Sequence, residues 1–187
     1  MIYRPIILDE EIIFSKKKFI VSKTDLEGNI LFVNQNFCDV TGYKYDELRG
    51  QPHSVVRHPD MPKAIFYMIW KSLLAGMEVS AIIKNVAKNG KYYWVIADFS
   101  MQRDKYGQLE TFTSFKRAAP EYVSEAIQEV YDGMCYSERK SGMEGSLRYL
   151  ENFLEEKQLS YNEYLEVLLK PKGVLTGLLG SFKKVFS

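Results

Sequence analysis

The residues of this chain best suited to chemistry are a guanidinium, an imidazole and a carboxylate that follow one another closely in residues 57–62. The run reads Arg57-His58-Pro59-Asp60-Met61-Pro62. Each proline fixes its own φ and biases the preceding residue away from helix, so we predict a stiff loop. Such a loop at the mouth of a small apolar domain fits a site for a polar ligand. An internal ion pair that only fixes the loop is the alternative.

The rest of the sequence offers no comparable set of catalytic groups. No Ser-His-Asp, Cys-His or paired-carboxylate arrangement stands out, so we do not expect an enzyme. Cys38 and Cys135 lie far apart and have neither metal-ligand spacing nor the pattern of a disulfide framework. We expect both to pack as small core residues in a reducing, cytoplasmic compartment.

Size and charge favour a small globular protein. The 187 residues are 46% hydrophobic and 26% charged, which fits one domain with an appendage or two small domains. The net charge of +1 gives no global electrostatic argument for a nucleic-acid partner. No signal peptide is recognisable, and no apolar run approaches the roughly 18 residues of a membrane span, so we expect a soluble chain without a transmembrane segment.

The hydrophobic pattern predicts two groups of strands on either side of a helical middle. A turn at Asp25–Asn29 separates the first two strands, and Asn89-Gly90 is typical of a tight hairpin turn. One antiparallel sheet of five strands, covered on one face by the helices, satisfies this order, so the fold class is α+β. The predicted strands are 19–24, 30–34, 79–86, 92–101 and 109–116, and the predicted helices are 36–41, 45–48 and 63–75.

The chain divides into an N-terminal cap (1–18), a central domain (19–118) and a helical extension (119–187). In the cap, Asp9–Glu11 suit a helix start, and the cap packs on its own domain or on a partner. In the extension, the apolar stripe Tyr122–Met134 predicts a packing or dimer helix, and Ser160–Glu163 form a capping box. The amphipathic tail Val174–Phe186 is expected to pack on its own domain or a partner rather than on a membrane.

The predicted order of strands and helices is that of a PAS domain, and several motifs sharpen this resemblance. The chain resembles the PAS sensor of bacterial aerotaxis and energy-taxis receptors over about residues 9–135, and the run at 57–62 is the most specific part. The motifs are Thr24-Asp25-Leu26-Glu27-Gly28, Asn34-Gln35-Asn36-Phe37, Thr41-Gly42-Tyr43, Glu47-Leu48-Arg49-Gly50-Gln51-Pro52-His53, Val56-Arg57-His58-Pro59-Asp60-Met61-Pro62-Lys63, Lys84-Asn85 and Lys88-Asn89-Gly90-Lys91-Tyr92-Tyr93-Trp94-Val95.

The resemblance implies a cofactor and a role. In that family the PAS pocket binds FAD non-covalently, and the redox state of the flavin is the signal. The chain is most similar to the stand-alone energy-taxis type, in which a soluble PAS protein works with a separate membrane-bound chemoreceptor. It carries no recognisable chemoreceptor coiled coil, kinase motif or cyclase motif, which agrees with a sensor that signals by protein contact.

The resemblance also implies which residues hold the cofactor. An Asn amide can both donate to and accept from the edge of an isoalloxazine, and Arg pairs well with a diphosphate. Alternation along the fourth strand adds Tyr93, which shares a face with Val95 and Ala97. The candidate cofactor-binding residues are therefore Asn34, Arg57, His58, Asp60, Trp70, Asn85 and Tyr93.

Several alternatives remain open from the sequence. Asn34 would serve equally as a helix cap, Trp70 as a core residue, and His53 as a core histidine. His58 suits a haem ligand, because other PAS sensors use a histidine in this way. A cofactor-free PAS adaptor that serves dimerisation, and an enzyme that turns over its flavin, are further readings. The Asn-Cys-Arg run of flavin photosensors is missing, so we expect no light-driven cysteinyl adduct.

Overall fold

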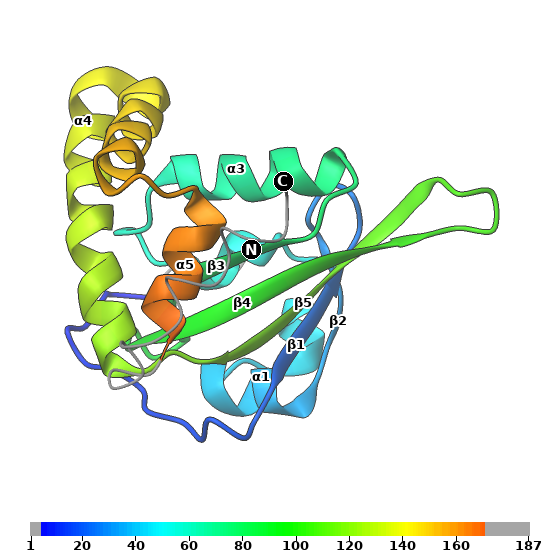
Figure 1. Ribbon diagram of the computed structural model, residues 1–187. Coiled ribbons are helices and arrows are strands. Elements are labelled where there is room, and N and C mark those ends of the chain that lie inside the picture. Colours follow the sequence, from blue (N-terminus) through cyan, green and yellow to red (C-terminus); the bar gives the residue numbers. More distant parts are fainter. Residues whose placement is uncertain (1–4, 171–187) are drawn as a thin grey trace.

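Five antiparallel strands form the single sheet of the computed structural model, which describes residues 5–170. The order across the sheet is β2-β1-β5-β4-β3, so the first hairpin lies beside the last strand (Figure 1). The α+β class and the five-stranded antiparallel sheet predicted from the sequence are confirmed. The strands are β1 (Ile20–Thr24), β2 (Ile30–Val33), β3 (Val79–Val86), β4 (Tyr92–Arg103) and β5 (Leu109–Ala118).

Short polar motifs close the turns between these strands. The carboxylate of Asp25 accepts hydrogen bonds from the backbone N–H of Asn29 at 2.7 Å and of Glu27 at 3.1 Å, which fixes the β1–β2 turn. Gly90 in the β3–β4 turn has φ +87°, where a side chain would be strained. Both turns are those that the sequence predicts.

The helices between β2 and β3 cover one face of the sheet, which we call the inner face. They are α1 (Gln35–Thr41), α2 (Tyr45–Leu48), the 3-10 turn η1 (His53–Val56) and α3 (Lys63–Leu74). In α3, the side chains of Ile65, Ile69 and Leu73 are buried at helical spacing, as the apolar pattern predicts. Helix α3 therefore packs over the sheet with its apolar face inward.

The C-terminal helices pack on the outer face and on the edge strand β3. In α4 (Glu121–Lys157), the Tyr131 hydroxyl donates to the Ile82 carbonyl at 2.7 Å, and its ring stacks on Trp94. The helix bends at Gly142, where φ is +68°. Helix α5 (Tyr161–Leu169) begins at the predicted capping box. The apolar stripe Tyr122–Met134 is thus largely buried within its own chain, and its use in a dimer stays a prediction.

The N-terminal segment differs from the sequence-based expectation. Residues 5–18 form no helix, so the helix start expected at Asp9–Glu11 is wrong. The backbone pairs instead with the β3–β4 hairpin, since Ile12 N–H donates to the Tyr92 carbonyl at 2.7 Å and Tyr92 N–H donates to the Glu10 carbonyl at 2.9 Å. These bonds and the edge contact of Phe14 with Tyr93 favour an extended segment that packs on its own domain.

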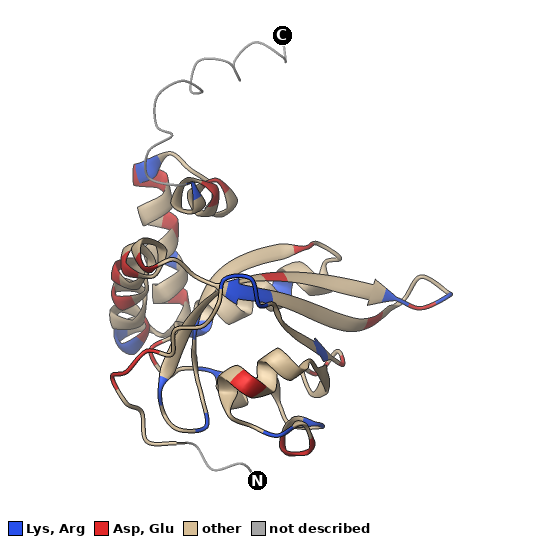
Figure 2. Cartoon of the chain, turned by 90° about the horizontal axis from the view of Figure 1, so that it is seen from below, with Lys and Arg blue, Asp and Glu red and all other residues tan. Residues whose placement is uncertain are grey.

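Charge is dispersed over the molecule. Figure 2 shows Lys and Arg interspersed with Asp and Glu around the described residues, in agreement with the net charge of +1. Among residues 5–170, no helix combines the length and the apolar character that a membrane crossing requires. The tail Val174–Phe186 lies outside the described residues.

Candidate functional site

A cavity of about 300 Å³ lies between the sheet and α3. Its volume is at the lower end of the range of small-molecule sites, about 300–1,000 Å³. Apolar side chains form most of the wall, and a few polar groups converge on it. The apolar lining includes Phe66, Ile69, Trp70, Leu73, Ile83, Phe99 and Phe112, and the polar lining includes Ser22, Thr24, His53, Ser54, Arg57, Asn85, Ser114 and Lys116.

Asn85 has an unsatisfied amide in this cavity. The residue is 3% exposed, and its Nδ2 group has no hydrogen-bond partner among the described residues. Strand β3 holds it in place through its register with Tyr93 of β4. A buried polar group without a partner costs about 1–3 kcal/mol, so this amide fits a ligand that offers an acceptor.

Arg57 places a positive charge on the cavity wall. Its guanidinium carbon lies 4.0 Å from the centre of the Phe66 ring, and Nη2 donates to the Met61 carbonyl at 3.3 Å. The backbone of Arg57 forms an isolated antiparallel bridge with Asn85. The loop 57–62 is therefore attached to the edge of β3, and one end of it reaches the cavity.

Trp70 forms a flat wall opposite the sheet. Its ring packs edge-on against Phe112, with 5.5 Å between ring centres. A Cβ atom on Gly28 would lie 2.9 Å from the indole, so the absence of a side chain at position 28 leaves room for this ring. Trp70 lies on the apolar face of α3, as its helical spacing predicts, and this face borders the cavity.

Lys116 is a buried, charged residue of the cavity lining that sequence reasoning missed. It is 2% exposed, and its Nζ lies 2.6 Å from Ser114 Oγ, 3.0 Å from Ser22 Oγ and 3.2 Å from His53 Nε2. Burial lowers the pKa of Lys116 to about 7. Burial and the lysine also hold the pKa of His53 well below its usual value, so this imidazole is neutral. The period of two along β5 was the available signal, because Lys116 shares a face with Phe112 and Ser114.

Asn34 and Tyr93 do not line the cavity. The Oδ1 atom of Asn34 accepts from Phe37 N–H at 3.0 Å and from Val21 N–H at 3.1 Å, while Nδ2 donates to the Phe19 carbonyl at 2.9 Å. It therefore caps α1 and ties it to β1. Tyr93 is fully buried on the inner face against Phe14, and burial raises its pKa.

His58 and Asp60 do not line the cavity either. His58 is buried, and its Nδ1 accepts from the backbone N–H of Asp60 at 3.2 Å. Burial and the positive charge of Lys84 lower the pKa of His58, so the ring is neutral, and its 3.4 Å approach to the Asp60 carboxylate is no ion pair. Direct contact of either residue with a cofactor stays a prediction.

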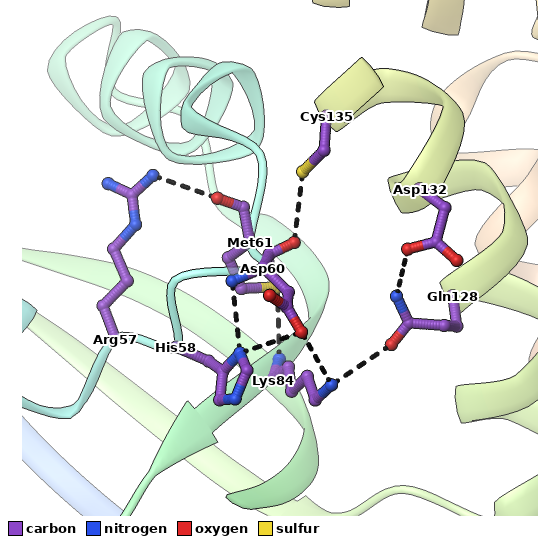
Figure 3. Close-up of polar contacts among 8 residues, drawn as sticks. All are labelled: Arg57, His58, Asp60, Met61, Lys84, Gln128, Asp132 and Cys135. Atoms are coloured by element: carbon purple, nitrogen blue, oxygen red, sulfur yellow. Dashed lines mark hydrogen bonds and ion pairs between the residues drawn. The ribbon is translucent and has the colours of Figure 1, made fainter. Parts of the chain in front are cut away.

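Asp60 connects the loop to α4 instead. Its carboxylate lies 3.2 Å from Lys84 Nζ, which also approaches the Gln128 side chain of α4 at 3.5 Å. The Cys135 thiol, again in α4, donates to the Asp60 carbonyl at 3.2 Å (Figure 3). Burial raises the pKa of this thiol to about 11, so it stays protonated. In the described part of the chain, no cluster of three His, Cys, Asp or Glu residues suits a metal ion.

Comparison with known proteins agrees with this architecture. Residues 30–115 match the family described as PAS fold. The aerotaxis receptor of Escherichia coli (strain K12) is 39% identical over 115 residues, which are 62% of this chain and 22% of the receptor. The biofilm dispersion protein BdlA of Pseudomonas aeruginosa is 31% identical over 86 residues, which are 46% of this chain and 21% of that protein. The chain thus matches about a fifth of each of these relatives.

Solved structures give the same fold. One described as "Flavin Analogue Sheds Light on Light-Oxygen-Voltage Domain Mechanism" superposes with a TM-score of 0.53 at 20% identity, over 59% of this chain and 83% of that chain. The light-state structure of the blue-light photoreceptor Aureochrome1 LOV has a TM-score of 0.52 at 18% identity, over 62% of this chain and 91% of that chain. At these identities the likeness concerns the fold alone. The described sheet and the helices that cover its inner face therefore have the PAS fold.

Proposed function

We propose that this chain is a redox sensor in taxis signalling, and that its cavity binds FAD. The observation that carries the proposal is the unpartnered amide of Asn85 in a cavity that Trp70 and Arg57 also line. An isoalloxazine edge offers both acceptors and a donor, which an Asn amide matches. The similarity to an aerotaxis receptor, and the flavin named for one light-oxygen-voltage domain of the same fold, support this choice.

The size and charge of the site favour a dinucleotide whose ring alone is buried. A volume of about 300 Å³ has room for a flat tricyclic ring but is small for a whole dinucleotide. Arg57 would pair with the diphosphate, because a guanidinium binds phosphate oxygens bidentately. Within residues 5–170 no cysteine lines the cavity, so a light-driven adduct has no nucleophile here.

The chain's own residues would convert the redox state into a change of structure. A bound flavin supplies a ring that takes up electrons and protons and so changes its hydrogen-bonding pattern. The Asn85 amide would then rotate or lose a hydrogen bond, at a cost of about 1–3 kcal/mol. Because Arg57 pairs with the backbone of Asn85, and Asp60 of the same loop contacts Lys84 and α4, a shift there would reach the outer helices.

The output would be a protein contact in the cytoplasm. The proposed partner is a membrane-bound chemoreceptor or another signalling protein, and the proposed sensor works as a stand-alone, soluble, non-enzymatic module. A cofactor-free adaptor is the main rival, and it would leave the Asn85 amide unsatisfied. A haem sensor has less support, because His58 does not line the cavity and His53 Nε2 is already bonded to Ser22 and Lys116.

The absorption spectrum of the purified chain tests the proposal. We expect the two bands of oxidised flavin, and we expect acid treatment to release FAD rather than FMN. A Soret band would identify haem instead. A colourless protein that takes up no added flavin would support the adaptor. Steady oxidation of a nicotinamide donor by the isolated flavoprotein would favour the alternative that the chain is an enzyme that turns over its flavin.

A further inference from the structure

Lys116 is a buried ammonium group, and within residues 5–170 it has no negatively charged partner. Its three neighbours at hydrogen-bond distance are Ser22, Ser114 and His53, and all three are neutral. Among the described residues no carboxylate lies within ion-pair distance of Nζ. From α1, the ring of Phe37 faces it, with 5.5 Å between Nζ and the ring centre.

Burying this ammonium group costs free energy, and a negatively charged ligand would offset that cost. A buried ammonium usually pairs with a carboxylate or loses its proton, because burial disfavours the charged form. Here the lowered pKa, about 7, reports that cost. Two serines and a histidine nevertheless hold the group in one place on the cavity wall, and they satisfy its three donors. The site is therefore arranged for a ligand that brings the negative charge itself.

We propose that Lys116 is the counter-charge of the reduced flavin ring, and that it raises the redox potential of the bound flavin. This inference rests on the proposed function. A flavin that accepts two electrons from an external donor and one proton from water carries a negative charge on its ring. The Lys116 ammonium stabilises that charge more than it stabilises the neutral oxidised ring, so it favours reduction.

The position of Lys116 assigns it to the ring rather than to the diphosphate. It is almost fully buried in β5, whereas the diphosphate would remain near Arg57, which is attached to the edge of β3. The strand order places β4 between β5 and β3, so Lys116 and Asn85 lie on opposite sides of that strand on the cavity wall. Lys116 and Asn85 would thus face different edges of one planar ring, and Lys116 would act on it through its charge.

The test is the midpoint potential of bound flavin, measured by dithionite titration with a reference dye, in the wild type and in Lys116→Met. Riboflavin serves as the probe beside FAD because it has no phosphate. We expect Lys116→Met to weaken the binding of reduced relative to oxidised flavin by about tenfold or more, which lowers the potential by about 30 mV or more for a two-electron couple. We expect this shift with both flavins.

Three controls distinguish the explanations. Lys116→Arg keeps the charge and is expected to retain most of the wild-type potential. Lys23→Met, next to Ser22 but on the other face of β1, is expected to leave the potential unchanged. Circular dichroism of each variant checks folding, and Lys116→Gln replaces Lys116→Met if the latter does not fold.

The outcomes separate this inference from the proposed function. A wild-type chain that binds neither flavin contradicts the proposed function, and this inference with it. If all variants bind flavin and the redox potential is unchanged, the role of Lys116 is contradicted but the proposed function is not. Loss of FAD affinity with an unchanged riboflavin potential would assign Lys116 to the diphosphate and would also overturn the inference.

Discussion

Arg57 and Asp60 belong to one short loop but contact opposite sides of the edge strand β3. Arg57 lines the cavity and packs on Phe66, whereas Asp60 binds Lys84, whose ammonium approaches Gln128 of α4. The backbone of Arg57 joins the loop to the strand through its bridge to Asn85. It therefore connects the ligand site on the inner face with the helix on the outer face.

The first prediction concerns this connection. Asp60→Asn removes the negative charge at Lys84, and because Asp60 is 54% exposed we expect a loss of stability below about 1 kcal/mol. Flavin binding should persist, whereas the difference in hydrogen exchange of α4 between oxidised and reduced protein should become smaller. The control is Glu47→Gln, which breaks the exposed pair with Lys88 away from the cavity. An unchanged difference in Asp60→Asn would contradict the connection.

The second prediction concerns the diphosphate. Arg57→Ala should lower the affinity for FAD by about tenfold or more, since a charge-assisted hydrogen bond contributes about 1.5–3 kcal/mol. The affinity for riboflavin should fall less, because riboflavin has no phosphate. Fluorescence titration of the apoprotein with both flavins measures this ratio. Arg117→Ala, whose guanidinium pairs with Asp98 and does not line the cavity, is the matched control. Equal losses for both flavins would argue against a phosphate contact.

The third prediction concerns the space around Trp70. Gly28 and Gly107 have similar φ values, +86° and +82°, so an alanine at either position costs about 1–2 kcal/mol of backbone strain. Only at Gly28 does the new Cβ meet the indole, at 2.9 Å, whereas Gly107 has open space. Thermal unfolding should therefore show a larger loss for Gly28→Ala, and flavin affinity should fall in that variant alone. Equal affinities would show that Trp70 does not border the ligand.

The fourth prediction concerns the pH dependence of stability in the apoprotein. The pKa of Lys116 is about 7 in the folded chain and near 10.5 in the unfolded chain. Between these values the unfolded state binds more protons, so the free energy of unfolding rises with pH, by at most about 1.4 kcal/mol per pH unit. Below about pH 7 both states are protonated, and this contribution to the slope vanishes.

Lys116→Met isolates that contribution. The difference in unfolding free energy between the wild type and Lys116→Met, measured by urea denaturation from pH 6 to pH 9, should change in favour of the wild type as pH rises. A difference independent of pH would mean that Lys116 titrates normally and is not held in a dry cavity.

Most of the fold followed from local signals in the sequence. The hydrophobic pattern predicted β3 with the bounds observed, and helical spacing predicted α3 to within one residue. The extended N-terminal segment was not predicted, because its acidic residues suit a helix start whereas its backbone pairs with Tyr92. Long-range pairing of this kind leaves no local pattern.

The candidate site was partly predictable. Trp70 and Asn85 were placed by the family resemblance, and the cavity position of each agrees with the face of its helix or strand. Lys116 was missed because a charged residue near the end of a strand normally points to solvent. Its burial depends on Ser22 and His53, which come from distant parts of the chain.

The most direct test follows the side-chain amide of Asn85 by nuclear magnetic resonance while FAD is added to the isotopically labelled apoprotein. We expect the amide signal to shift as FAD binds and to show nuclear Overhauser contacts with protons of the isoalloxazine ring. If FAD binds while this amide keeps its chemical shift and shows no such contact, the ring does not occupy the cavity beneath α3.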